Sequence, residues 1–142
     1  MTAAYFDSSA LVKLVIDEQG SEEAALLWDG ADVVATSRVA HPEVRAALAA
    51  ARRSNRLDAD LHLAAKAAWD ELRASIRLVE LTADVEAMAA ELAEDHGLSG
   101  FDAIHLSSAL VLSELDVVVA TWDVRLHRAA GDERLRTLPR TL

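Results

Sequence analysis

The stretch that decides the fold is Ala3-Ala4-Tyr5-Phe6-Asp7-Ser8-Ser9-Ala10-Leu11-Val12-Lys13-Leu14. It opens with an uncharged apolar run, continues with an acid and two hydroxyls, and then takes on a helical pattern. The apolar run predicts a buried strand that ends at Asp7. Ligands of open α/β sheets bind outside the carboxyl ends of the strands, so an acid here could hold a cation beside a substrate. Asp and Ser are also favoured helix N-caps, and Asp7 or Ser8 could have that structural role instead.

Strand-like and helical segments alternate along the whole chain. The predicted strands are 3–6, 32–35, 76–81 and 117–121, with a weaker fifth at 136–138. The predicted helices are 9–17, 21–29, 38–54, 58–74, 83–95, 101–115 and 124–130. The alternation predicts an α/β fold with βαβ units, a parallel sheet and right-handed crossovers. Most strands are nearly all apolar, as in sheets covered on both faces. The third carries Arg77 and Glu80 and is expected nearer an edge.

Length and composition restrict the class of protein. A chain of 142 residues, 52% hydrophobic, is long enough for one domain with a real core, and we expect a single domain over 1–142. There is no cysteine, so a metal site would have to use carboxylate oxygens or imidazole. No apolar run is long enough to span a bilayer, and the N-terminus lacks the pattern of a signal peptide. We therefore expect a cytoplasmic protein without a membrane segment.

The formal charge of −10 argues at first against a nucleic-acid partner, which favours a basic surface. Clustered active-site acids neutralised by a metal would weaken that objection, and a basic partner protein could match an acidic surface. Candidates for phosphate contacts, or equally for an ordinary solvated helix face, are Arg38, Arg45, Arg52 and Arg53.

A second acid of interest lies in the predicted helix 38–54, for which Ser37 is the expected N-cap. The apolar stripe of this helix is Val39, Ala40, Val44, Ala47 and Ala51. Glu43 lies at the border of that stripe and in the early turns, hence close to the carboxyl edge of the sheet. A half-exposed helix Glu is the alternative interpretation. We expect His41 to be a surface residue.

The predicted helix 58–74 carries no evident chemistry. Its expected core residues are Leu61, Ala65, Ala68 and Leu72. Trp69 could belong to the core or to a partner surface.

A third acid, Asp102, begins the predicted helix 101–115. This helix is apolar on nearly every side and should be buried. Ser99 and Asp102 have the spacing of a capping box, which would explain both without chemistry. The helix leads directly into strand 117–121, so it must run antiparallel to that strand. Its N-terminus then lies at the carboxyl edge of the sheet, near Asp7. We expect His105 to be buried and hydrogen-bonded.

The fourth acid repeats the opening pattern of strand, hydroxyl, acid and helix. Asp123 follows strand 117–121 and Thr121, and is again an N-cap candidate. Each acid alone has an ordinary explanation, but four at one sheet edge repel one another, which a divalent cation would relieve. Oxygen ligands favour Mg²⁺ or Mn²⁺. Such a site could activate a water for phosphodiester hydrolysis without a covalent nucleophile.

These residues also carry a family resemblance. The segments 6–14, 37–43, 98–106 and 121–123 resemble, in order, the motifs of PIN-domain ribonucleases, most of all the VapC-type toxins of bacterial toxin–antitoxin pairs. The resemblance implies a three-layer α/β/α sandwich around a parallel sheet of four to five strands. It implies a toxin that cuts RNA, works as a homodimer and is silenced by a cognate VapB-type antitoxin.

The resemblance also implies roles for individual residues. The acidic metal-binding and catalytic set would be Asp7, Glu43, Asp102 and Asp123, with Mg²⁺ or Mn²⁺ as the cofactor. Ser8 and Thr121 match positions where the family often has a supporting hydroxyl.

Two other classes of function use a similar edge. A haloacid-dehalogenase-type phosphatase would need a second Asp two residues after Asp7, where this chain has Ser9. A receiver domain would need an Asp ending a middle strand and a late Lys, and neither occurs. A non-catalytic α/β module that binds phosphate or nucleic acid through the acidic edge stays open as the alternative.

Overall fold

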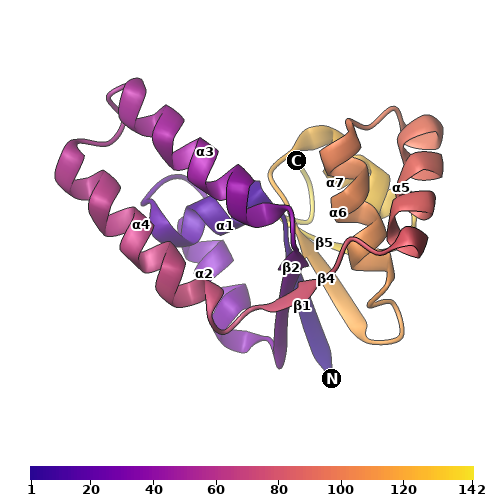
Figure 1. Ribbon diagram of the computed structural model, residues 1–142. Coiled ribbons are helices and arrows are strands. Elements are labelled where there is room, and N and C mark those ends of the chain that lie inside the picture. The colour runs from indigo at the N-terminus through magenta and orange to yellow at the C-terminus, as the bar shows by residue number, and fades with distance from the viewer.

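The computed structural model describes residues 1–142 and contains a five-stranded parallel sheet with seven helices around it (Figure 1). The strands are β1 (Thr2–Phe6), β2 (Val33–Ser37), β3 (Arg77–Val79), β4 (Asp116–Ala120) and β5 (Arg136–Leu138). The helices are α1 (Ser8–Val15), α2 (Ser21–Gly30), α3 (Ala40–Arg53), α4 (Ala59–Arg73), α5 (Ala83–His96), α6 (Gly100–Leu110) and α7 (Val124–Asp132). None of these helices has the length and apolarity that a membrane crossing needs.

The strand order is β3-β2-β1-β4-β5, and every neighbouring pair is parallel. The chain runs outward from β1 to β3, returns to the other side of β1, and continues from β4 to β5. Because parallel crossovers are right-handed, this reversal sends α1–α4 to one face and α5–α7 to the other (Figure 1). The predicted three-layer sandwich, the fifth strand and the edge position of the third strand are confirmed.

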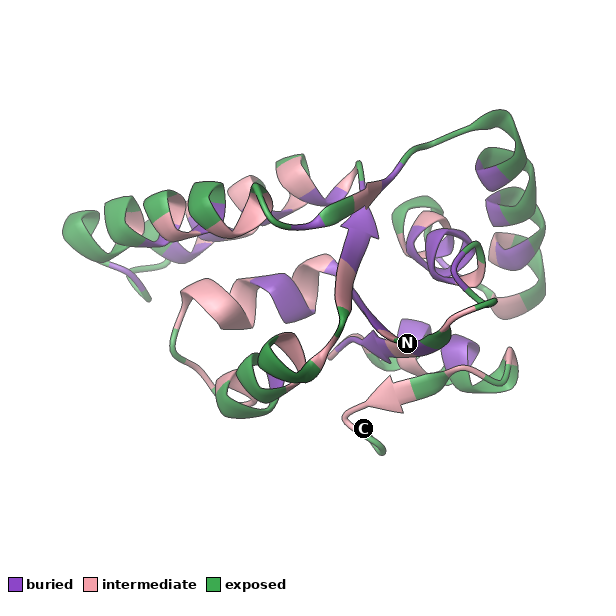
Figure 2. Cartoon of the chain, turned by 90° about the horizontal axis from the view of Figure 1, so that it is seen from below, coloured by how far each residue is buried: buried purple, intermediate pink, exposed green.

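The two cores meet at β1, which explains why the opening run has no charged residue. Ala3 and Tyr5 point to the α5–α7 layer, whereas Ala4 and Phe6 point to the α1–α4 layer. All four are fully buried, because successive side chains of a strand face opposite sides and both sides are covered (Figure 2). The strand therefore brings Asp7 to the middle of the carboxyl edge, between the two helical layers.

Some predicted boundaries are wrong. α6 ends at Leu110 rather than at residue 115, because the chain tightens into i→i+3 turns before it enters β4, such as Leu115 N–H to the Leu112 carbonyl at 2.9 Å. Ser37 is the last residue of β2, and the N-cap of α3 is Val39. The Ser37 hydroxyl still accepts a hydrogen bond from the Val39 N–H at 3.2 Å.

The predicted core face of α4 is partly wrong. Ala65 and Trp69 are buried, but Leu61 is 55% exposed. Helix α4 is turned so that the i, i+4 pair Ala65 and Trp69 faces α1 and α3. The indole Nε1–H of Trp69 donates to His41 Nδ1 at 2.9 Å, and the two rings stack. His41 is therefore a half-buried partner of the core rather than a free surface residue.

The loop before α2 provides a stability test. Gly20 has φ +92°, and a Cβ there would lie 2.9 Å from three atoms of the Trp122 ring. We expect Gly20→Ala to lower the free energy of unfolding by about 2–4 kcal/mol, through left-handed strain and overlap with the indole. Gly30→Ala is the control, because nothing lies within 4 Å of its added Cβ. Urea unfolding measures both, and equal midpoints for the two variants would contradict this packing.

Candidate active site

Asp7 is a buried carboxylate with all its hydrogen bonds supplied by its own edge of the sheet. It is 3% exposed and is the N-cap of α1. Its Oδ1 accepts from the Ala10 N–H at 2.9 Å and from the Ser9 hydroxyl at 2.6 Å. Its Oδ2 accepts from the Thr121 hydroxyl at 2.6 Å. Capping accounts for one of these three bonds, and the two hydroxyls fix the orientation of the carboxylate.

The register of β1 and β4 explains why Thr121 reaches Asp7. Phe6 pairs with Ala120, and the Asp7 N–H donates to the Ala120 carbonyl at 3.2 Å. The next residue of each strand, Asp7 and Thr121, is therefore side by side. The chain adds β2 and β3 on one side of β1, and β4 and β5 on the other. The point between β1 and β4 is therefore the topological switch point, where α/β sheets bind ligands.

The hydroxyl of α1 that bonds to Asp7 in the structure is that of Ser9, whereas the predicted Ser8 lines the neighbouring cavity. The Ser9 hydroxyl donates to Asp7 and accepts from the Trp122 N–H at 2.9 Å, so it ties the start of α1 to the end of β4. Ser8 is half-buried and makes no hydrogen bond to Asp7. The sequence alone does not show which of these two adjacent hydroxyls faces Asp7, because that depends on the direction of the first turn of α1.

Asp123 joins the same cluster from α7. It is the N-cap of that helix, and its Oδ1 accepts from the Leu126 N–H at 2.9 Å. Its own N–H donates to the Thr121 hydroxyl at 3.1 Å. Thr121 therefore connects two of the predicted acids, with one hydrogen bond to each.

Asp102 lies in the first turn of α6, and the Ser99 hydroxyl caps that turn by accepting from the Asp102 N–H at 3.2 Å. The side chain of Asp102 is half-buried. Burial raises its pKa, the charge of Asp123 raises it further, and the charge of Asp7 acts in the same direction. These effects require the three aspartates to lie within electrostatic reach of one another.

Burial also raises the pKa of Asp7, although the charge of His105 and the hydroxyls of Ser9 and Thr121 oppose that rise. None of Asp7, Asp102 and Asp123 forms an ion pair with a Lys or Arg within 4.0 Å. The cluster thus contains mutually repelling carboxylates without a compensating cationic side chain.

Glu43 reaches this edge from the opposite layer, on α3. Its side chain is 23% exposed, and its Oε1 lies 2.6 Å from Nε2 of His105. His105 is 1% exposed, and its Nδ1 lies 2.7 Å from the Tyr5 hydroxyl, so its predicted buried, hydrogen-bonded state is confirmed. The four predicted acids therefore come from both helical layers and from β1 between them.

The donor set fits a hard divalent cation by its chemistry. It consists of carboxylate oxygens, with hydroxyls that orient them, and no Lys or Arg pairs with the three aspartates to offset the repulsion. The carboxylates share one edge, but no three His, Asp or Glu side chains already meet closely enough to hold an ion together.

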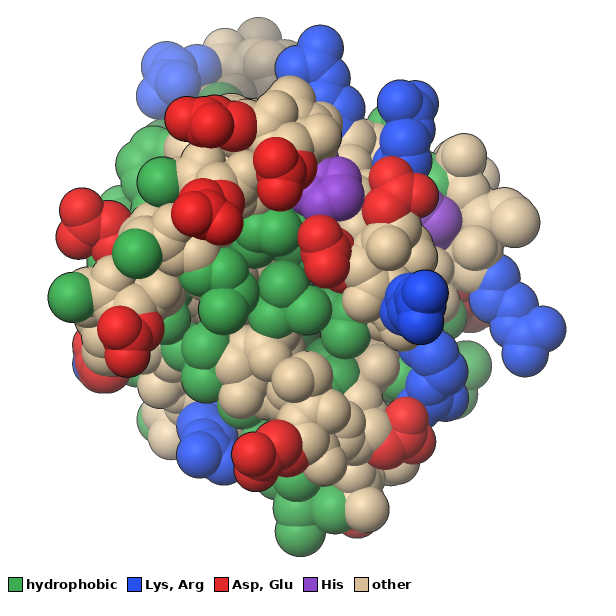
Figure 3. Space-filling view, turned by 90° about the vertical axis from the view of Figure 1, so that its right-hand side faces the viewer, with side chains coloured by type: hydrophobic (Ala, Val, Ile, Leu, Met, Phe, Trp, Pro, Cys, Tyr) green, Lys and Arg blue, Asp and Glu red, His purple; other side chains and the backbone are tan.

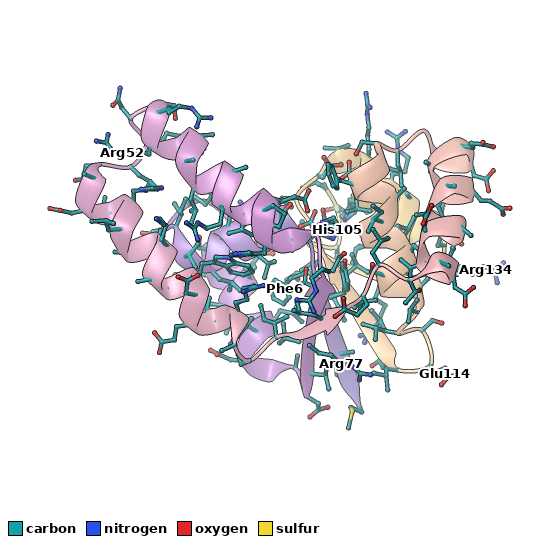
Figure 4. The ribbon with its side chains drawn as sticks, in the orientation of Figure 1. Phe6, Arg52, Arg77, His105, Glu114 and Arg134 are labelled. Atoms are coloured by element: carbon teal, nitrogen blue, oxygen red, sulfur yellow. The ribbon has the colours of Figure 1, made fainter.

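The cationic side chains near this edge are engaged by other groups or line a small cavity that none of the four acids lines. Arg38 is engaged by Glu80, and Arg52 lies at the far end of α3 from His105 (Figure 4). A cavity of about 270 Å³ adjoins the start of α1, with Lys13 and Arg56 in its lining next to Ser8 and Ser9. Sequence reasoning did not identify this pair. In contrast, acidic side chains are spread over the face seen from the α5 side (Figure 3).

Comparisons with known proteins agree with this geometry. The sequence matches the PIN domain profile over residues 4–132. It is 49% identical over 142 residues to Ribonuclease VapC45 of Mycobacterium tuberculosis (strain CDC 1551 / Oshkosh), covering all of this chain and 99% of that protein.

Two solved structures share the fold. PAE2754 from Pyrobaculum aerophilum superposes with a TM-score of 0.70 at 20% identity, over 97% of this chain and 85% of that one. A toxin–antitoxin complex from Klebsiella pneumoniae contains a chain with a TM-score of 0.55 at 20% identity, over 81% and 83% of the two chains. The end-to-end similarity to VapC45, together with the profile match, shows that this chain belongs to the PIN-domain family, among its VapC-type ribonucleases.

Proposed function

We propose that this protein is the toxin of a type II toxin–antitoxin pair, a metal-dependent endoribonuclease that hydrolyses RNA phosphodiester bonds with a metal-activated water. The observation that carries the proposal is the group of three aspartates without cationic partners at the sheet's switch point. The chain's 49% identity to a protein named a ribonuclease supports the proposed reaction. We treat residues 1–142 as one catalytic unit.

We assign the acids as follows. Asp7, Asp102 and Asp123 hold the ion, and Glu43 completes the set from α3. PIN-domain ribonucleases generally depend on a divalent metal, and we propose Mg²⁺, with Mn²⁺ as a substitute. When bound, the ion supplies an activated water and offsets charge on the phosphate. Ser9 and Thr121 keep both oxygens of Asp7 turned in fixed directions.

The partners follow from the same family. The substrate is RNA, and Arg56, in the cavity at the start of α1, suits a contact to its phosphates, whereas Lys13 in the same cavity is engaged by Glu18 at 3.0 Å. The similar Klebsiella chain comes from a toxin–antitoxin complex, which supports a cognate VapB-type antitoxin here. The net charge of −10 favours a partner segment with basic residues. We further propose a homodimer that acts in the cytoplasm.

The first test is cleavage of bacterial total RNA by the purified protein. We expect discrete fragments with Mg²⁺ or Mn²⁺, no cleavage with EDTA, and a loss of about 100-fold or more in Asp7→Asn, because the neutral amide keeps the shape but not the charge. The matched control is Asp58→Asn, since Asp58 caps α4 in the same way, through the Leu61 N–H at 2.8 Å, far from the acids in the sequence.

Full activity in Asp7→Asn would contradict the mechanism. A protein that binds Mn²⁺ but cleaves no RNA would instead favour the non-catalytic phosphate- or nucleic-acid-binding module. A loss in Asp58→Asn equal to that in Asp7→Asn would show that capping, and not the charge of Asp7, is what the assay detects.

The pKa of Asp7 predicts a second, activity-independent effect. Because burial raises this pKa above its unfolded value of 3.8, the folded metal-free protein holds the Asp7 proton more tightly than the unfolded chain does. The associated stability is present below the unfolded pKa and is lost as pH rises through the folded pKa.

In EDTA, the stability of Asp7→Asn relative to the wild type should therefore increase as the pH rises above the unfolded pKa of 3.8. Urea unfolding of both proteins across that range measures it. A difference that stays constant or decreases with pH would show that Asp7 is not a destabilising buried charge.

A further inference from the structure

A continuous chain of hydrogen bonds runs from the core to the candidate active site. The Tyr5 hydroxyl lies 2.7 Å from Nδ1 of His105, and Nε2 of His105 lies 2.6 Å from Oε1 of Glu43. Tyr5 and His105 are 0% and 1% exposed, whereas Glu43 is partly open to solvent. We call these three side chains the Tyr5–His105–Glu43 chain.

The surroundings determine which atoms carry the protons. Burial raises the pKa of Tyr5 well above its usual value, so the phenol keeps its proton. Because the Glu43 carboxylate can only accept, Nε2 of His105 carries a hydrogen and donates it to Oε1 of Glu43, while Nδ1 of the same ring shares a hydrogen bond with the Tyr5 hydroxyl.

The chain also bridges the two helical layers. Tyr5 points into the α5–α7 layer and His105 is on α6, whereas Glu43 is on α3 in the other layer. Helix α6 packs on α5 and α7, and α3 packs on α1 and α4. In Figure 4, His105 lies between α3 and α6, where the two layers approach each other. The hydrogen bond from His105 to Glu43 thus ties α3 to α6 at the edge that carries the acids.

We propose that His105, oriented by Tyr5, is a positioning residue that fixes the Glu43 carboxylate and so sets its separation from the aspartates of the other layer. This inference rests on the proposed function. Only Oε1 of Glu43 is hydrogen-bonded, so Oε2 is free to serve the site. Partners that orient metal-binding carboxylates and reactive groups commonly contribute 10- to 100-fold, roughly, to metal affinity or activity.

The test compares two substitutions of His105. His105→Leu removes the donor, whereas His105→Gln keeps an amide N–H close to the position of Nε2. We expect His105→Leu to lower kcat roughly 10- to 100-fold and to weaken Mn²⁺ binding by calorimetry to a similar extent, with KM for RNA little changed. His105→Gln should recover most of both quantities. Tyr5→Phe, which removes only one oxygen, should give a smaller loss of the same kind.

Two further variants distinguish a merely structural role of His105 from the positioning of Glu43. In a Glu43→Ala background, His105→Leu should cost little more in Mn²⁺ affinity and kcat, because the residue through which it acts is already absent. His96→Leu is the matched control: it breaks a similar pair, His96 with Glu133 at 2.8 Å, outside the site, and should leave Mn²⁺ binding and cleavage unchanged.

Two results would overturn the proposal. One is a His105→Leu protein that binds Mn²⁺ and cleaves RNA like the wild type. The other is a His105→Leu substitution that lowers Mn²⁺ affinity and kcat by as large a factor in the Glu43→Ala background as in the wild type. If the wild type cleaves no RNA, the proposed function fails, but the Mn²⁺ titrations of the same variants still decide whether His105 positions Glu43.

Discussion

The parallel pairing of β1 with β4 is the constraint on which the rest of the structure depends. It joins the first strand of the chain to a strand more than one hundred residues later and makes β1 the centre of both cores. The pairing also brings the two strand ends together, so that Asp7 meets Thr121. Because the strand order continues outward on opposite sides of this pair, the end of β1 is the kind of edge at which α/β sheets bind ligands.

The acids at this edge work against stability as well as for function. Three of the helices carry an acid of the cluster at the N-cap or in the first turn, and two of those acids are N-caps. Capping gives each Asp a favourable local position near a helix N-terminus, which favours negative charge. Burial and mutual repulsion still raise the pKa of Asp7 and Asp102. Each carboxylate is thus stabilised by its helix N-terminus, whereas the group as a whole is destabilised by burial and repulsion. Such a group is typical of a cation-binding site.

The elements of the fold could be predicted because patterns within short segments decide them. The uncharged run before Asp7 and the alternation of strand-like with helical segments are sufficient to predict the order of strands and helices along the chain. The edge location of Asp102 followed from chain direction alone, since α6 leads into β4. Long-range side-chain partners could not be predicted in this way. The indole of Trp69 selects His41, and the first turn of α1 selects Ser9 over Ser8. These choices depend on helix rotation, which an amphipathic pattern determines only approximately.

The central claim is that Asp7, Asp102, Asp123 and Glu43 form one divalent-metal site between the two layers. The most direct measurement is a crystal structure with Mn²⁺, with data collected to reveal its anomalous signal. The account predicts an anomalous peak coordinated by carboxylate oxygens of Asp7, Asp102 and Asp123, with Glu43 beside it and still bonded to His105. A peak elsewhere, such as at His96 and Asp132, with none at the end of β1, would contradict it.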